Sequence, residues 1–264
     1  MRRAALLRIA SAGTSAAVVV SLAACGGSSA QHGSLAASPA AGGTAPPATQ
    51  APTTTTVEEP KPYDPSKPVD LGGEPGVTPA EQHRAERLVE ATIAELKHFT
   101  TPAEAYAAGY RSIGDALTGD EHYVKWSYVD DGHILDPQRP ESLVYEYRDG
   151  KQQVVAAMYM MPFGSRFTDV PDVGGPLTQW HVHRDICLTN DPEQKVVSSL
   201  TTPDGSCPPG SSKAGNTPML HVWVVPNPCG PFAALEGIGG GQIPDGQTRL
   251  CDTAHGEPAS TSGG

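Results

Sequence analysis

The chain has 264 residues and is acidic, with 18 lysines and arginines against 29 aspartates and glutamates and a formal charge of −11 at pH 7. Such a charge repels phosphate backbones and anionic lipid surfaces, so it argues against a nucleic-acid-binding protein and against direct electrostatic adhesion to a membrane. The sequence contains no G-x-S-x-G, P-loop, H-E-x-x-H or EF-hand motif, so no common hydrolase, nucleotide or calcium site is indicated.

The first residues have the three-part layout of a secretory signal. Three arginines precede an apolar stretch at residues 9–20, and the sequence Leu22-Ala23-Ala24-Cys25-Gly26 follows it. These five residues resemble the lipobox of bacterial lipoprotein precursors. The resemblance implies that residues 1–24 are removed and that Cys25 carries the lipid, which anchors the protein on the outer face of the cell membrane. A transmembrane helix is the alternative, but the apolar stretch is short for a bilayer.

The next segment is predicted to be a tether. Removal of residues 1–24, with their three arginines and no acids, leaves 15 basic and 29 acidic residues, a formal charge of −14. Residues 25–77 begin with the lipidated cysteine and are rich in Pro, Thr and Ala. They hold too few apolar groups to offset the entropy of ordering, so we expect a disordered linker. Residues 78–258 are long enough for one globular domain, and 259–264 form a disordered tail.

Four cysteines lie in the predicted domain: Cys187, Cys207, Cys229 and Cys251. An even number in an exported chain predicts two disulfides. Three pairings are possible, and Cys187 with Cys207 and Cys229 with Cys251 would each close a modest loop. A cysteine metal site is the rival, but no C-x-x-C pair is present.

Two helices are expected at the start of the domain. Thr78-Pro79-Ala80-Glu81 combines a capping residue, a proline at the first helical position and an acid at the third. This pattern predicts a helix over residues 79–98. Thr101-Pro102-Ala103-Glu104 repeats it, and Gly109 is placed to end a second, shorter helix.

Strands are expected in the rest of the domain. Residues 142–148 and 152–160 flank Asp149-Gly150, a dipeptide suited to a tight turn, and so predict a β-hairpin. Two more strands are predicted at residues 179–188 and 217–225. The predicted fold class is therefore α+β, with an N-terminal helical pair packed on a mainly antiparallel β-sheet or small β-barrel that is braced by two disulfides.

A histidine pair and a third histidine are the leading candidate site. Side chains two apart in a strand point to the same face, so His181 and His183 should project together. His221 lies among apolar residues in the next predicted strand, and the three imidazoles could present three nitrogens to a metal ion. Asp185, which is in phase with the pair, or His122 could add a ligand. His122 and His133 are the weaker candidates, because the residues around both are predicted to form loops. The alternative is that these histidines are ordinary hydrogen-bonded core residues.

Other residues suggest variants of this site. Met158 and Met160 share a strand face, and thioethers suit Cu(I), although methionine in a strand more often fills a core. Three tryptophans are expected first to be core or pocket-lining residues: Trp126, Trp180 and Trp223. With Tyr145, Tyr147 and Tyr159 they could also form an apolar cleft over the metal. The metal could be Zn, Cu, Fe or Mn.

Gly175, followed after five residues by His181-Val182-His183, resembles the first motif of the cupins, and His221 could stand where that family has a later histidine. The resemblance covers about fifty residues. Cys187 and Leu188 stand where the cupin glutamate is expected, and the later P-x-G is missing. The folded region is also similar to actinobacterial-type secreted proteins of uncharacterised function, through stretches such as residues 108–115, 174–181 and 221–226. This similarity implies export and no particular activity.

The sequence therefore predicts an exported, lipid-anchored domain that binds or delivers a transition metal. A cupin-like metalloenzyme that uses the same histidines, with Glu146 or Asp185 moving protons, is one alternative. A metal-free module that binds an envelope component or a partner protein in an aromatic cleft is the other.

The lipid anchor is tested by replacing Cys25 with serine. We expect labelled palmitate to be incorporated into the wild-type protein and to be lost from Cys25→Ser, because the serine has no thiol to carry the thioether. Equal labelling of the two proteins in the same strain would show that Cys25 is not the lipid attachment point.

Overall fold

The computed structural model describes residues 55–56, 61–116, 119–191, 194–234, 238–240 and 247–248. All of them belong to one compact unit, Gln50–Gly264. The predicted signal, Cys25 and the tail at 259–264 lie outside the described residues, so these remain predictions. Within the described ranges, no helix has both the length and the apolar character needed to cross a bilayer.

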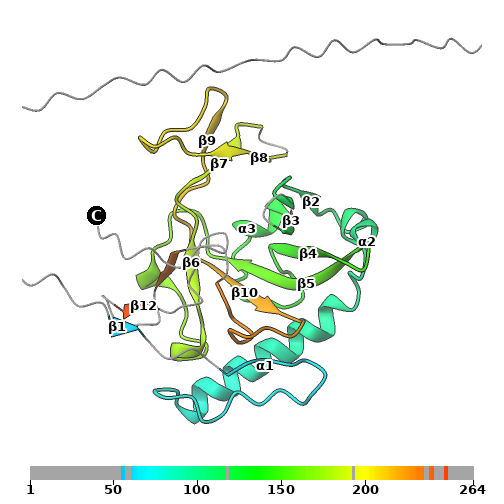
Figure 1. Cartoon of the computed structure of the whole chain (residues 1–264), viewed down its shortest axis with the longest axis vertical. Helices are drawn as coiled ribbons and strands as arrows, with labels where there is room; N and C mark the ends of the chain where they lie inside the picture. Colours follow the sequence, from blue (N-terminus) through cyan, green and yellow to red (C-terminus); the bar gives the residue numbers. More distant parts are fainter. Residues whose placement is uncertain are drawn as a thin grey trace, which may run out of the picture. The chain divides into compact units, whose positions relative to one another are not determined.

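The described elements form an α+β fold with two antiparallel sheets (Figure 1). The helices are α1 (Pro79–Leu96), α2 (Pro102–Ala107) and α3 (Trp126–Val129), with short 3₁₀ turns at Phe167–Asp169 and Gly175–Leu177. The main sheet has the order β11 (Ile238–Gly240), β6 (Trp180–Val182), β10 (Met219–Trp223), β5 (Lys151–Met160), β4 (Ser142–Arg148), β3 (Asp120–Val124) and β2 (Arg111–Ser112). The small sheet has the order β8 (Val197–Leu200), β7 (Ile186–Thr189) and β9 (Ser211–Lys213). A short parallel pair joins β1 (Thr55–Thr56) to β12 (Gln247–Thr248).

Both predicted helix starts are confirmed. The Thr78 hydroxyl accepts from the Glu81 N–H at 3.3 Å, and the Glu81 carboxylate accepts from the Thr78 N–H at 2.6 Å. These reciprocal bonds satisfy two backbone donors that a helix start leaves open. The Glu104 carboxylate likewise accepts from the Thr101 N–H at 2.8 Å. Gly109 follows α2 with φ +94°, a conformation that glycine adopts without strain.

The predicted hairpin is also confirmed. Asp149 and Gly150 connect β4 to β5 with φ values of 51° and 75°, as the two central residues of a type I′ turn require. The two strands pair along their length, from Arg148 opposite Lys151 to Ser142 opposite Met158. This hairpin forms the middle of the main sheet.

Two strand predictions differ from the structure. Residues 179–188 were expected to form one strand, but they are divided between β6 in the main sheet and β7 in the small sheet. The polar pair Arg184-Asp185 lies at this break, where the chain leaves one sheet for the other. β3 was expected to be a loop, because its first two residues, Asp120 and Glu121, belong to types with low β-propensity.

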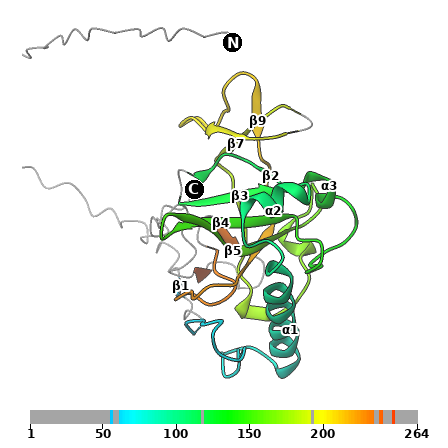
Figure 2. The ribbon, with the colours of Figure 1, turned by 90° about the vertical axis from the view of Figure 1, so that its right-hand side faces the viewer.

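The main sheet has two different faces. Leu220 and Val222 of β10 belong to the core cluster that includes Val89 of α1, and α1 lies against β5 and β10 (Figure 2). Because side chains alternate along a strand, Met219, His221 and Trp223 point to the opposite face. Met219 and Trp223 join a second apolar cluster there. The histidines of interest therefore lie on the face that α1 does not cover.

The packed domain includes residues that the sequence assigned to the tether. Tyr63 pairs with Asn227, each backbone N–H donating to the other's carbonyl at 2.9 and 3.0 Å. Tyr63 and Leu71 are both buried in the core on the α1 side. The packed region thus includes residues ahead of the expected boundary at 78.

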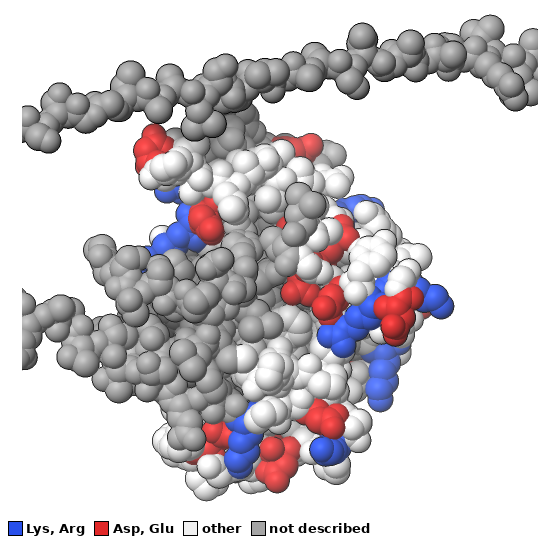
Figure 3. All heavy atoms as spheres, viewed as in Figure 1, with Lys and Arg blue, Asp and Glu red and all other residues white. Residues whose placement is uncertain are grey.

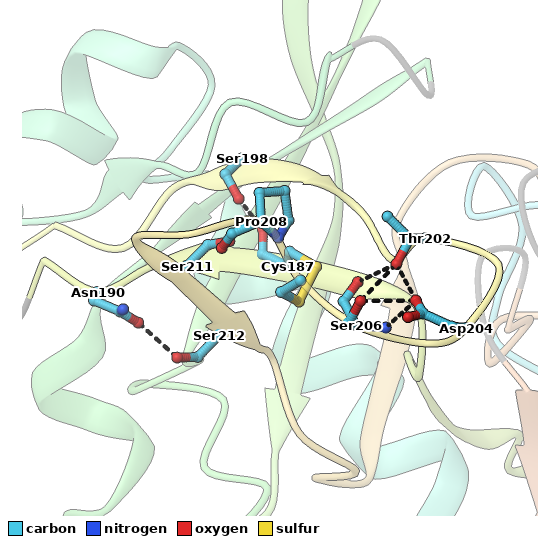
Figure 4. Close-up of a disulfide and its surroundings, with 10 residues drawn as sticks. Cys187, Asn190, Ser198, Thr202, Asp204, Ser206, Pro208, Ser211 and Ser212 are labelled. Carbon is cyan, nitrogen blue, oxygen red and sulfur yellow. Dashed lines mark hydrogen bonds between the residues drawn. A yellow bond between two sulfur atoms is a disulfide. The ribbon is translucent and has the colours of Figure 1, made fainter.

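The small sheet is braced by a disulfide between Cys187 in β7 and Cys207 in the turn-rich loop that precedes β9 (Figure 4). This is one of the two predicted pairings. Asp204 organises the loop beside it, accepting from the backbone N–H and hydroxyl of Ser206 at 3.2 and 2.7 Å. Cys251 lies outside the described residues, so its predicted pairing with Cys229 remains a prediction.

Charged side chains of both signs are interspersed over the face drawn in Figure 3. Several charged side chains of the described residues form ion pairs, such as Arg84 with Asp172 at 3.0 Å. Exposed pairs of this kind contribute little to stability, so the fold depends mainly on the two apolar clusters.

The contribution of the disulfide can be measured in a Cys187→Ala, Cys207→Ala double variant. We expect its free energy of unfolding to fall by about 3 kcal/mol, because the bond closes a loop of 20 residues and restricts the unfolded chain. Urea unfolding followed by circular dichroism measures this change. A loss below about 0.5 kcal/mol would show that the loop closure does not stabilise the domain.

Candidate metal centre

Four histidines from three parts of the chain lie together on the face of the main sheet that α1 does not cover. The ring centroids of His181 and His221 are 4.8 Å apart, those of His181 and His183 are 5.5 Å apart, and those of His122 and His221 are 5.4 Å apart. His122 lies in β3, His181 in β6, His183 directly after β6, and His221 in β10. The predicted trio therefore converges, and His122 joins it.

The strand register explains the meeting of His181 and His221. His181 of β6 is opposite Met219 of the neighbouring β10. His221, two residues further along β10, projects from the same face. All of these side chains are buried.

His122 reaches the cluster across two intervening strands. β4 and β5 lie between β3 and β10, and their residues in this region include Ser142, opposite Met158, and Ala156, opposite Val144. Despite these intervening strands, the Nε2 atoms of His122 and His221 approach to 3.1 Å.

An aspartate orients the imidazole of His122. The two carboxylate oxygens of Asp115 lie 2.7 Å from its Nδ1 and 2.9 Å from its backbone nitrogen. An ionised carboxylate only accepts hydrogen bonds, so Nδ1 carries the proton in the neutral ring and Nε2 presents a lone pair. That lone pair faces His221.

His181 has the same tautomer for a different reason. Its Nδ1 lies 3.2 Å from the carbonyl oxygen of Gln179, which can only accept, so Nε2 again holds the lone pair. Neither Nε2 of His181 nor Nδ1 of His221 has a hydrogen-bond partner among the described residues, and both atoms are buried. Buried polar atoms without partners are rare and costly.

Burial keeps these rings uncharged. Desolvation, with a smaller contribution from the positive potential of His122, lowers the pKa of His181 from 6.5 to about 4. Desolvation also lowers the pKa of His221 well below 6.5, with smaller contributions from the three other histidines. Both imidazoles are therefore neutral at pH 7, which is the form that coordinates metal ions. As the side chains stand, however, no group of three or more His, Cys, Asp or Glu residues in the described part of the chain is arranged to hold a metal ion.

Asp185 is on the link between β6 and β7, where its carbonyl accepts from the Thr201 N–H at 2.7 Å. The carboxylate of Asp115 contacts the cluster through His122. His133 is more than half exposed and pairs with Asp131 at 3.0 Å. Asp115 could not be predicted from the sequence, because its approach to His122 depends on the turn between β2 and β3.

A cavity of about 410 Å³ adjoins the cluster. His122 and His183 contribute to its lining, together with apolar side chains of the main sheet such as Met158 and of β7 such as Leu188. The predicted cleft with three tryptophans is wrong in its composition. Trp126 lines this cavity, but Trp180 and Trp223 are buried in the two core clusters.

No protein-family model matches the chain, and comparison with curated proteins and with solved structures finds no significant match. The resemblances to the cupin motif and to secreted actinobacterial proteins therefore remain predictions. The chemistry of the site has to be inferred from its own geometry.

The burial of His181 predicts a pH-dependent stability in the presence of a chelator. Its pKa is lower in the folded state than the unfolded value of 6.5, so the unfolded chain binds more protons between about pH 6.5 and pH 4. Stability is therefore full above pH 6.5 and falls as the pH drops to 4, by up to about 3 kcal/mol from this group.

Unfolding free energies from pH 4 to 7 for wild type, His181→Gln and His133→Gln measure this effect. We expect a flatter pH dependence in His181→Gln and the wild-type dependence in His133→Gln, where an exposed ring is replaced. Identical curves for all three proteins would mean that His181 is not desolvated.

Proposed function

We propose that the domain binds one transition metal ion through the imidazoles of His122, His181 and His221. The observation that carries this proposal is the pair of fixed tautomers: His122 donates its Nδ1–H to Asp115, and His181 donates its Nδ1–H to Gln179. Metal-binding histidines characteristically donate the second ring N–H to a carboxylate or a backbone carbonyl, which orients the ring and makes the other nitrogen more basic.

The buried nitrogens support the same conclusion energetically. Leaving a buried polar atom without a partner costs about 1–3 kcal/mol, and the described residues provide none for Nε2 of His181 or Nδ1 of His221. Coordination would satisfy the Nε2 lone pair of His181. A cluster of neutral imidazoles also avoids the repulsion that protonated rings would cause at these distances.

The rings must turn to surround an ion. Nε2 of His122 and Nε2 of His221 already lie 3.1 Å apart, a separation that a shared ion at about 2.0–2.1 Å from each nitrogen can bridge. The His181 ring, whose centroid lies 4.8 Å from that of His221, would have to move so that its Nε2 reaches the same point while its Nδ1 stays on the Gln179 carbonyl. The His183 ring, whose centroid lies 5.5 Å from that of His181, lines the cavity. It would be a further ligand of the ion or would lie beside a coordination position that the protein leaves open.

Imidazole nitrogens bind Zn, Cu and Fe, so the set of donor atoms alone does not select one metal. Met158 is the cross-strand neighbour of His221 and offers a thioether on the same face, which favours copper as Cu(I). We favour metal binding or delivery over catalysis. Glu146, considered as a proton carrier, is held in an ion pair with Arg148 on the hairpin. With lipid on Cys25, the site would lie outside the membrane.

Elemental analysis of the natively exported domain tests the proposal. We expect one metal ion per chain in wild type and less than a tenth of that in a His122→Ala, His181→Ala, His221→Ala variant, because three of the ligands are gone. Asp115→Asn should keep the ligands but weaken metal affinity about 10–100-fold. Titration of the chelator-treated proteins with Zn²⁺ and Cu⁺ measures these affinities.

The matched control is a His83→Ala, His98→Ala, His133→Ala variant, which removes the same number of imidazoles outside the cluster and should retain the metal. Circular dichroism establishes that the variants remain folded. Wild type that carries no more metal than the triple cluster variant, or metal that is lost in the control as well, would contradict the proposal.

A further inference from the structure

The cavity beside the histidines has a composition that points to a second kind of ligand. Its volume of about 410 Å³ is within the range of small-molecule sites. Most of its wall is apolar, with Trp126 and Phe163 on one side and Ile186 and Leu188 of β7 on another. Phe163 is 47% exposed, so apolar surface continues to the mouth.

The charges that line this cavity are unusual for so acidic a chain. Lys195 and Lys213 both contribute to the lining, and neither forms an ion pair with a carboxylate among the residues described by the structure. The amine of Lys195 lies 5.3 Å from the ring centroid of Trp126 and 5.2 Å from that of Phe163. The lysine is thus held between two aromatic rings of the wall.

The acidic group of the lining is already engaged. Among the described residues, Asp115 is the acid that lines the cavity, and its two oxygens accept from the ring and the backbone of His122. The amine of Lys213 lies beside Gly205, which is not part of the lining. An anion that enters the cavity therefore meets the amine of Lys195, while the carboxylate is turned to the histidine. The chain as a whole has more acids than bases, 29 to 18, and repels such a molecule.

We propose that this cavity binds a small organic acid, an apolar ring or chain with a single anionic group, whose apolar body packs on Trp126, Phe163 and Leu188 and whose anion meets Lys195. The apolar wall supplies the affinity through burial of the ligand's surface. The lysine selects the anion over its uncharged analogue. Binding does not require a metal ion at the histidines.

Two fluorescent probes of the same aromatic body test this selection. We compare 8-anilino-1-naphthalenesulfonate, which carries one negative charge, with uncharged N-phenyl-1-naphthylamine, using the full exported domain with and without chelator. We expect saturable binding of the anion at one site per chain. In Lys195→Gln, Lys213→Gln, which removes both lysines of the lining, its Kd should rise roughly threefold, as expected for the loss of one partly exposed charge pair at Lys195, while the Kd of the neutral probe stays the same.

The matched control is Lys97→Gln, Lys151→Gln, which removes the same charge from the end of α1 and the start of β5 and should leave both Kd values unchanged. Raising the salt concentration to 1 M should weaken binding of the anion alone. Decanoate should displace the anionic probe more effectively than decanol.

The His122→Ala, His181→Ala, His221→Ala variant should still bind the anion, so failure of the metal proposal leaves this one standing. An equal Kd for the anion in wild type and the Lys195, Lys213 variant would overturn it. So would an equal effect of the control variant, or an absence of saturable binding.

Discussion

The structure of the site depends on one constraint, the burial of neutral imidazoles against one face of a β-sheet. Removing a histidine from water disfavours its protonated form, and a ring that stays neutral must still find partners for one donor and one acceptor nitrogen. Asp115 and Gln179 take the donors of His122 and His181. The acceptor Nε2 of His122 faces Nε2 of His221, and that of His181 is buried without a partner among the described residues; a metal ion is the shared partner that we propose.

The fold meets this constraint through its long-range pairing. His122 and His221 are 99 residues apart in the chain, and they meet because β3 and β10 lie on either side of the β4–β5 hairpin in one sheet. α1 packs on the other face and leaves the histidine face free. The small sheet, braced by Cys187–Cys207, supplies the opposite wall of the adjoining cavity.

Local patterns in the sequence predict the local structure well. The two Thr-Pro-x-Glu starts and the Asp149-Gly150 turn act through bonds within a few residues, and each occurs where it was expected. The alternation in His181-Val182-His183 likewise indicates that both rings share a face. The predicted length of the strand at residues 179–188 was wrong. The chain leaves the main sheet at Arg184-Asp185 to enter the small sheet, and the periodicity of the sequence does not indicate this exit.

The partners from distant strands could not be predicted in this way. His122 follows Asp120 and Glu121, whose low β-propensity does not predict a strand. Asp115 is positioned by a turn between β2 and β3. The tryptophans were expected in the core or in the lining of a pocket, because large apolar side chains fill a core wherever the packing admits them; Trp180 and Trp223 do so, and Trp126 lines the cavity. Where the histidines of a site come from three strands, the register decides its members.

The most direct test of the account is a long-range ¹H–¹⁵N NMR spectrum of the histidine rings in chelator-treated protein at pH 7, before and after one equivalent of Zn²⁺. The account predicts neutral rings for His122 and His181, each protonated at Nδ1, and a selective change of both Nε2 resonances when zinc is added. Protonated rings, Nε2–H tautomers or unchanged Nε2 resonances would contradict it.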